Sequence, residues 1–143
     1  MLRETESSRL AYFPGDIERT FWLTGHGDLL RLLHNTIRWI TRDESIVHVK
    51  GDGFIEMFAW ETTAGYSVHL LNYTNANAHH GWLNSVSPLA PQRVSMKLPS
   101  GVKVKTVELL RAGIRVPFRL ESEVLTFSIP RVEDYEVAAV TVG

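Results

Sequence analysis

The sequence predicts a mainly β protein, an antiparallel β-sandwich of about eight strands preceded by one strand and one α-helix. Two observations predict this class. From Ser45 onward, apolar residues recur with a period of two, and turn residues separate the runs at short intervals. Before Ser45, apolar residues recur at helical spacing in one segment only. We therefore expect a disordered tip at 1–8, a strand–loop–helix segment at 9–44 and the sandwich at 45–143.

The first segment opens with "RLAYF" (9–13), a short strand that the turn dipeptide Pro14-Gly15 ends. The helix is expected to begin near Thr24 or Gly27, where Asp28 suits the positive end of the helix dipole. Its apolar residues share one stripe, which comprises Leu29, Leu30, Leu33, Ile37 and Ile40.

The strands of the sandwich follow from alternation and turn residues. "FIEMFAWE" (54–61) is apolar on both faces, so we expect a central strand. In 102–111 the inward phase slips by one residue, which predicts a bulge near Thr106. The other expected strands are 46–50, 66–73, 93–98, 115–120, 123–130 and 135–142. The expected core includes Phe58, Leu70, Val94, Leu109, Phe127 and Val137.

The composition restricts the partners that we expect. A net charge of -1 with scattered basic residues favours neither nucleic acid nor an anionic membrane. The chain has no cysteine, which removes disulfides and thiolate metal sites. No apolar run reaches the roughly 18 residues of a membrane helix, and the polar start "MLRETESSR" does not resemble a signal peptide. We expect a cytoplasmic protein with no cofactor, no nucleic-acid partner and no membrane partner.

Residue spacing alone predicts no catalytic site and no metal site. The six histidines form no His-x-x-x-His or His-x-Glu frame, so no metal ligands are assigned. Glu56, between Ile55 and Met57, has two interpretations: a buried acid of raised pKa, or a residue of a solvent-facing stripe, which we favour. Asp16 and Glu18 are a second pair of candidate acids for an independent hydrolase.

The loop 74–92 offers a different kind of site. It is long and polar and contains Trp82 in the stretch "HHGWLNS". An exposed tryptophan on a β-sandwich is typical of a carbohydrate-binding module, whereas a buried one would close the edge of the sandwich. We favour the second interpretation and keep both.

Several stretches together resemble the C-terminal portion of a family of glycoside-hydrolase-like proteins. They are "YFPGDIERTFWLTGHGDLLRLLHNTIRW" (12–39), "GDGFIEMFAW" (51–60), "VHLLNYTN" (68–75), "PLAPQRVSMKLP" (88–99), "VELLRAG" (107–113) and "IPRVEDYEVAAV" (129–140). Members of this family begin with a TIM barrel, continue with a flavodoxin-like domain of the β-galactosidase trimerisation type, and end in a β-sandwich.

The resemblance implies that 9–44 is the last strand, loop and helix of the flavodoxin-like domain. The barrel that carries the catalytic carboxylates has no counterpart here, so no catalytic residue is carried over. The loop 14–22 would follow a parallel strand at its carboxyl end, where open α/β sheets bind ligands. The candidate ligand or interaction residues are Asp16, Arg19, Trp22, His26 and Trp82.

These features favour a non-catalytic accessory or oligomerisation module. A carbohydrate-binding module using loop 74–92 is the alternative, and an independent glycoside hydrolase is a weaker one. The strand–helix segment without its sheet exposes an apolar stripe, so we expect self-association through residues 9–40 or binding to a separate subunit that carries the missing domains. The expected interface residues are Leu29, Leu33, Ile37 and Ile40.

Overall fold

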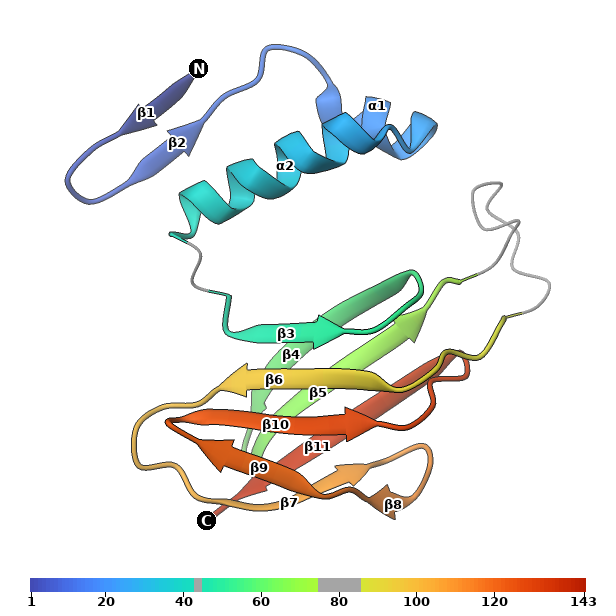
Figure 1. Cartoon of the computed structure of the whole chain (residues 1–143). Coiled ribbons are helices and arrows are strands. Elements are labelled where there is room, and N and C mark those ends of the chain that lie inside the picture. The colour runs from blue at the N-terminus through green and yellow to red at the C-terminus, as the bar shows by residue number, and fades with distance from the viewer. Residues whose placement is uncertain (43–44, 75–85) are drawn as a thin grey trace. The chain divides into compact units, whose positions relative to one another are not determined.

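The computed structural model describes residues 1–42, 45–74 and 86–143. The chain divides into two compact units, Met1–Ser45 and Ile46–Gly143. Figure 1 labels the helices and strands of both units. Each unit is considered by itself below.

The first unit opens with a β-hairpin. β1 (Leu2–Glu4) pairs antiparallel with β2 (Arg9–Ala11), and Leu2 lies opposite Ala11. The side chain of Thr5 closes the turn, because its Oγ1 accepts a hydrogen bond from the Ser8 amide at 3.0 Å. The tip 1–8, expected to be disordered, thus contains a strand, since pairing with β2 and the closed turn satisfy its polar backbone.

Two helices follow, where the sequence predicted one. α1 (Ile17–Thr24) occupies most of the expected loop 14–22 and ends at Gly25, whose φ of 63° is the left-handed conformation that glycine adopts easily. α2 (Gly27–Ile40) is the predicted helix, with Asp28 in its first turn. The α1 pattern was missed because eight residues are too few to reveal a helical period.

The second unit is an antiparallel β-sandwich, as predicted. Among the described residues it has a four-stranded sheet, in the order β3-β6-β10-β9, and a five-stranded sheet, in the order β4-β5-β11-β7-β8. The strands are β3 (Val47–Lys50), β4 (Ile55–Thr62), β5 (Gly65–Asn72), β6 (Gln92–Lys97), β7 (Val104–Leu109), β8 (Ile114–Arg115), β9 (Phe118–Glu121), β10 (Val124–Ile129) and β11 (Tyr135–Val142).

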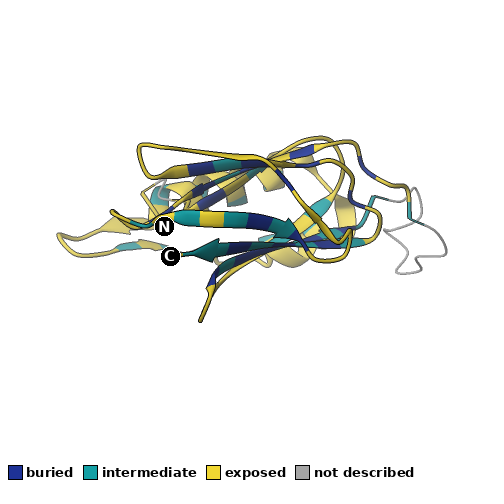
Figure 2. Cartoon of the chain, turned by 90° about the horizontal axis from the view of Figure 1, so that it is seen from below, coloured by how far each residue is buried: buried dark blue, intermediate teal, exposed yellow. Residues whose placement is uncertain are grey.

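The core of the sandwich lies between its two sheets. Figure 2 shows buried segments alternating with exposed ones along the strands, as expected of strands with one face inward. Four of the expected core residues are buried: Leu70, Val94, Leu109 and Phe127. The bulge predicted near Thr106 is confirmed, because Thr141 pairs with Thr106 while Val142 pairs with Val104, leaving Lys105 unmatched.

Two expected core residues were assigned to the wrong face. Phe58 is 41% exposed, because it lies opposite His69 on the face of the sheet away from the core. Its strand β4 is an edge strand and not the central strand that its apolar residues suggested. Val137 is only half-buried, since the inward phase of β11 belongs to Glu136, Ala138 and Val140.

The buried carboxylate of Glu136 explains that phase. Its two oxygens accept backbone hydrogen bonds from Arg111 at 2.9 Å, from Ala112 at 3.1 Å and from Val137 at 2.9 Å. A charged group buried in a sandwich is stabilised when several N–H donors surround it. Glu136 therefore ties β11 to the turn that follows β7.

Candidate functional site

The residues predicted as a ligand site in the first unit lie on and beside the two helices. Asp16 is the N-cap of α1, because its Oδ1 accepts a hydrogen bond from the Arg19 amide at 3.2 Å. His26 is the N-cap of α2, with its Nδ1 accepting from the Asp28 amide at 3.3 Å. Both side chains therefore have a structural role that the sequence analysis did not assign to them.

The other predicted ligand residues are Arg19, Trp22 and Trp82. Arg19 and Trp22 lie on α1, and both side chains are exposed, Trp22 to 82%. Trp82 lies outside the described residues, as does the rest of the segment 75–85 of loop 74–92. Among the described residues, the buried Asn72 connects the two ends of this loop, because its Nδ2 donates to Ser87 O at 2.8 Å.

The apolar stripe of α2 is partly covered within its own unit. Leu29 and Leu33 are half-buried, whereas Ile37 and Ile40 are 59% and 40% exposed. At the end of the helix, Arg9 donates from Nη1 to Trp39 O at 2.8 Å, and its guanidinium lies 5.3 Å from the centre of the Trp39 ring. The hairpin is thus joined to α2, but a large part of the stripe faces solvent.

A second exposed apolar surface lies on the five-stranded sheet, on the face away from the core. We call it the outer aromatic face and define it by Phe58, Trp60, His69 and Tyr135. The register places Phe58 opposite His69 on β5, and it places Trp60 opposite Ser67. Trp60 is 59% exposed, so a large aromatic surface is available at the edge of this sheet.

A chain of hydrogen bonds crosses the outer aromatic face. Ser67 Oγ lies 3.2 Å from His69 Nε2, and His69 Nδ1 lies 2.6 Å from the Tyr135 hydroxyl. The rings of His69 and Tyr135 are 5.9 Å apart, centre to centre. These two hydrogen bonds hold the His69 imidazole between β5 and β11. The polar groups of Ser67, His69 and Tyr135 thus lie beside the exposed rings of Phe58 and Trp60.

The sequence analysis assigned Phe58 to the core, although the sequence contained a signal for the position of both Phe58 and Trp60. The turn "TTAG" (62–65) aligns Trp60 with Ser67 and Phe58 with His69. In β5, Ser67 and His69 alternate with the core residues Val68 and Leu70, so they lie on the opposite face of the sheet. The aromatics therefore share the face of Ser67 and His69.

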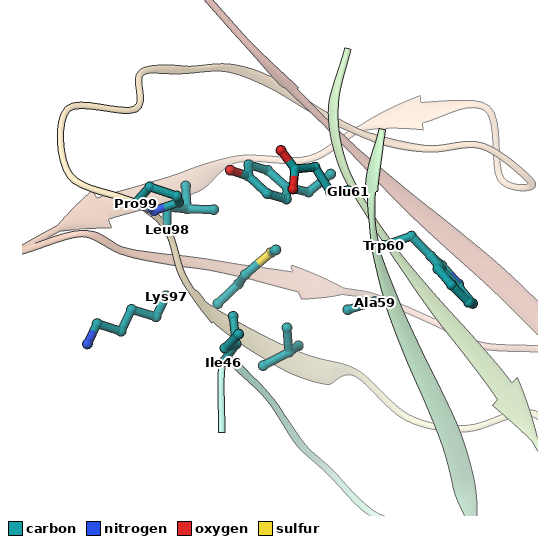
Figure 3. A pocket seen from close by; sticks show the side chains of 10 residues that line it. Ile46, Ala59, Trp60, Glu61, Lys97, Leu98 and Pro99 are labelled. Carbon is teal, nitrogen blue, oxygen red and sulfur yellow. The ribbon is translucent and has the colours of Figure 1, made fainter. Parts of the chain in front are cut away.

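A pocket of about 480 Å³ opens between the two sheets of the sandwich, beside β3 and β4. In Figure 3, Ile46, Lys97, Leu98 and Pro99 lie across the pocket from Ala59 and Glu61, while the ring of Trp60 points away. Its lining is mainly apolar, with Glu61, Lys97 and the Tyr66 ring at its sides. The pocket marks the place where the edges of the sheets do not close over the core.

The candidate acids are placed as follows. Glu56 is exposed on the edge strand β4, in agreement with the solvent-facing interpretation, and Glu18 is exposed in the first turn of α1. Within the residues that the structure describes, no three or more His, Asp or Glu side chains are grouped to hold a metal ion. None of the helices in the described ranges is long and apolar enough to span a membrane.

A solved enzyme structure contains a region that is similar in fold to this chain. Alpha-L-fucosidase isoenzyme 2 from Paenibacillus thiaminolyticus aligns with 99% of this chain at a TM-score of 0.73 and 16% identity. The fold is shared with part of a glycoside hydrolase. This chain spans 22% of the length of that fucosidase chain. No family model and no curated protein matches the sequence.

Proposed function

We propose that this chain is a non-catalytic accessory module of a glycoside-hydrolase-like protein, corresponding to its C-terminal region. The observation that carries the proposal is the alignment of 99% of this chain with 22% of a fucosidase chain. The side chains support it, because Asp16 caps a helix and Glu56 lies exposed on an edge strand. Such positions suit structural and surface roles.

The test is a hydrolysis screen of the purified chain against nitrophenyl glycosides, fucosides among them. We expect no release of nitrophenol above the buffer rate. Turnover that disappears in Glu56→Gln, or in Asp16→Asn with Glu18→Gln, would contradict the proposal and favour an independent hydrolase. A folded state identical by circular dichroism is the control for each variant.

The module also associates, in this proposal, through residues 9–40. The exposed side chains of Ile37 and Ile40 support this, because burying one large aliphatic side chain contributes about 1.5–3 kcal/mol. The occupant is a second copy of the chain, or a subunit that carries the family's other domains.

Light scattering and sedimentation of the intact chain at tens of micromolar test this association. We expect a dimer or a larger assembly, and Leu33→Asp should weaken it at least about tenfold or make the chain insoluble. Lys103→Glu, on the exposed surface of the sandwich, is the matched control and should change nothing. A monomer with α2 packed against its own chain would contradict this part of the proposal.

Glycan binding by the sandwich is a second candidate function. The exposed Phe58 and Trp60 beside the His69–Tyr135 hydrogen bond favour it, because sugar sites combine apolar rings with a few fixed polar groups. Affinity electrophoresis in gels that contain polysaccharides measures it. Retardation that persists in Trp60→Ala but disappears in Trp82→Ala would assign the site to loop 74–92.

A further inference from the structure

The sandwich has four sheet edges among its described strands, and they differ in how they are protected. β3 has four residues and includes His48 and Lys50, while β9 has four residues and includes Arg119. β8 has only two residues. Short length and basic side chains are the usual means by which an edge strand avoids pairing with another chain.

β4 is neither short nor basic, and its charged residues are Glu56 and Glu61. It has eight residues, and its sequence "IEMFAWET" contains no lysine, arginine or proline. Its pairing with β5 runs without a register shift from Ile55 to Thr62, so no bulge bends the edge away. From Phe58 to Thr62 every residue of the strand is exposed. The longest edge of the described sandwich is therefore uninterrupted, exposed and aromatic.

The side chains of β4 are complementary to a second copy of the same strand. Consider two antiparallel copies of β4 related by a two-fold axis at Ala59, with their aromatic faces on the same side. In this register Phe58 lies opposite Trp60 of the second copy, twice, and Glu56 lies opposite Thr62 of the second copy. No carboxylate faces another carboxylate. Shifting the strands by one residue would place Glu56 opposite Glu61 and put the two aromatic faces on opposite sides.

From these observations we propose that β4 is a homodimerisation edge, at which two copies of the chain join their five-stranded sheets into one continuous antiparallel sheet. The two-fold relation satisfies the free backbone groups of both edges with the same contacts. It also joins the two outer aromatic faces, so that Phe58 and Trp60 of one copy continue into those of the second. This edge is separate from residues 9–40 and does not depend on the association proposed there.

The absence of cysteine in the chain permits a direct test by cross-linking of the intact 143-residue chain. In the proposed register Ala59 meets its own copy, with Cα atoms at about 4.5–5.5 Å, within the range that a disulfide bridges. Under mild oxidation, Ala59→Cys should form a covalent dimer, whereas Lys103→Cys, at an exposed position on the sandwich, should remain mostly uncross-linked. A failure of Ala59→Cys to cross-link, or an intact chain that stays monomeric at tens of micromolar, would overturn the proposal.

A second measurement separates this edge from the first unit. Trp60→Lys introduces the side chain that protects the other edges and, combined with Ala59→Cys, should lower the cross-linked fraction at least about tenfold at equal protein concentration. Trp22→Lys replaces an even more exposed tryptophan of α1 and should leave the cross-linking of Ala59→Cys intact. An unchanged cross-linked fraction in Trp60→Lys, or cross-linking that is lost in a soluble Leu33→Asp variant, would overturn the assignment to β4. The proposal would also be wrong if the chain were monomeric and β4 paired with an added extended peptide but not with a second copy.

Discussion

The two units of the chain contain apolar residues arranged for burial, but only one of them buries these residues fully. In the sandwich, Leu70, Leu125 and Ile129 have no exposed surface. In the first unit, no described residue reaches the buried class, and both helices lack buried side chains. An amphipathic helix needs a partner surface to bury its apolar face, whereas two facing sheets bury the apolar side chains of one another.

The sandwich should therefore carry most of the stability, and the largest effect is expected in its core. Phe127, on β10, is 3% exposed. Phe127→Ala should lower the free energy of unfolding by about 3–5 kcal/mol, through lost transfer energy and the cavity left behind. Urea denaturation followed by circular dichroism measures it. Trp22→Ala, in the first unit, is the contrast and should change this free energy by less than about 0.5 kcal/mol. Equal losses of unfolding free energy in Phe127→Ala and Trp22→Ala would contradict the prediction that the sandwich carries most of the stability.

A buried carboxylate should produce the next effect. Glu136→Gln replaces one accepting oxygen by an amide group that cannot accept a hydrogen bond from the nearby backbone amides. We expect the sandwich to lose about 1–3 kcal/mol in the same denaturation experiment, because a buried N–H loses its partner. Glu108→Gln is the control, since its 3.8 Å contact with Arg115 is at the surface. If the loss of unfolding free energy is as small as in the control, the prediction is wrong, and water accepts the hydrogen bond of the backbone amide in place of the lost carboxylate oxygen.

The smallest effect is expected in the first unit. Arg9→Ala removes the hydrogen bond to Trp39 O and the 2.7 Å ion pair with Glu4. Because these contacts are near the surface, we expect a local loss of about 1 kcal/mol. It should appear as roughly fivefold faster amide exchange in 2–4 and 9–11, with the strands of the sandwich unchanged. Arg3→Ala, opposite Leu10 in the same hairpin, should leave the exchange rates close to those of the unmodified chain.

How far the sequence predicts this molecule depends on the kind of signal. Alternation identified the sandwich and its core strands, and even the bulge beside Thr106, because a period of two is visible in six to eight residues. The hairpin at 2–11 was missed because its pairing depends on a turn closed by Thr5 and Ser8, which has no apolar pattern. The cap roles of Asp16 and His26 were missed because a polar residue before a helix can equally be a ligand. The edge position of β4 was missed because sheet order is set by partners distant in sequence.

The position of β11 has a consequence for the order in which the molecule can be made. This strand lies between β5 and β7, and its amides extend the contact to the preceding hairpin, as Val142 N donates to Ala64 O at 3.0 Å. During synthesis on the ribosome, β4, β5 and β7 leave the exit tunnel before β11. Without β11, β5 and β7 lack the strand that pairs with both of them. Until β11 emerges, the aromatic strand β4 and its neighbour are exposed as an isolated hairpin, which is marginally stable alone. We therefore expect the nascent chain to be prone to aggregation until β11 has emerged and joins β5 to β7.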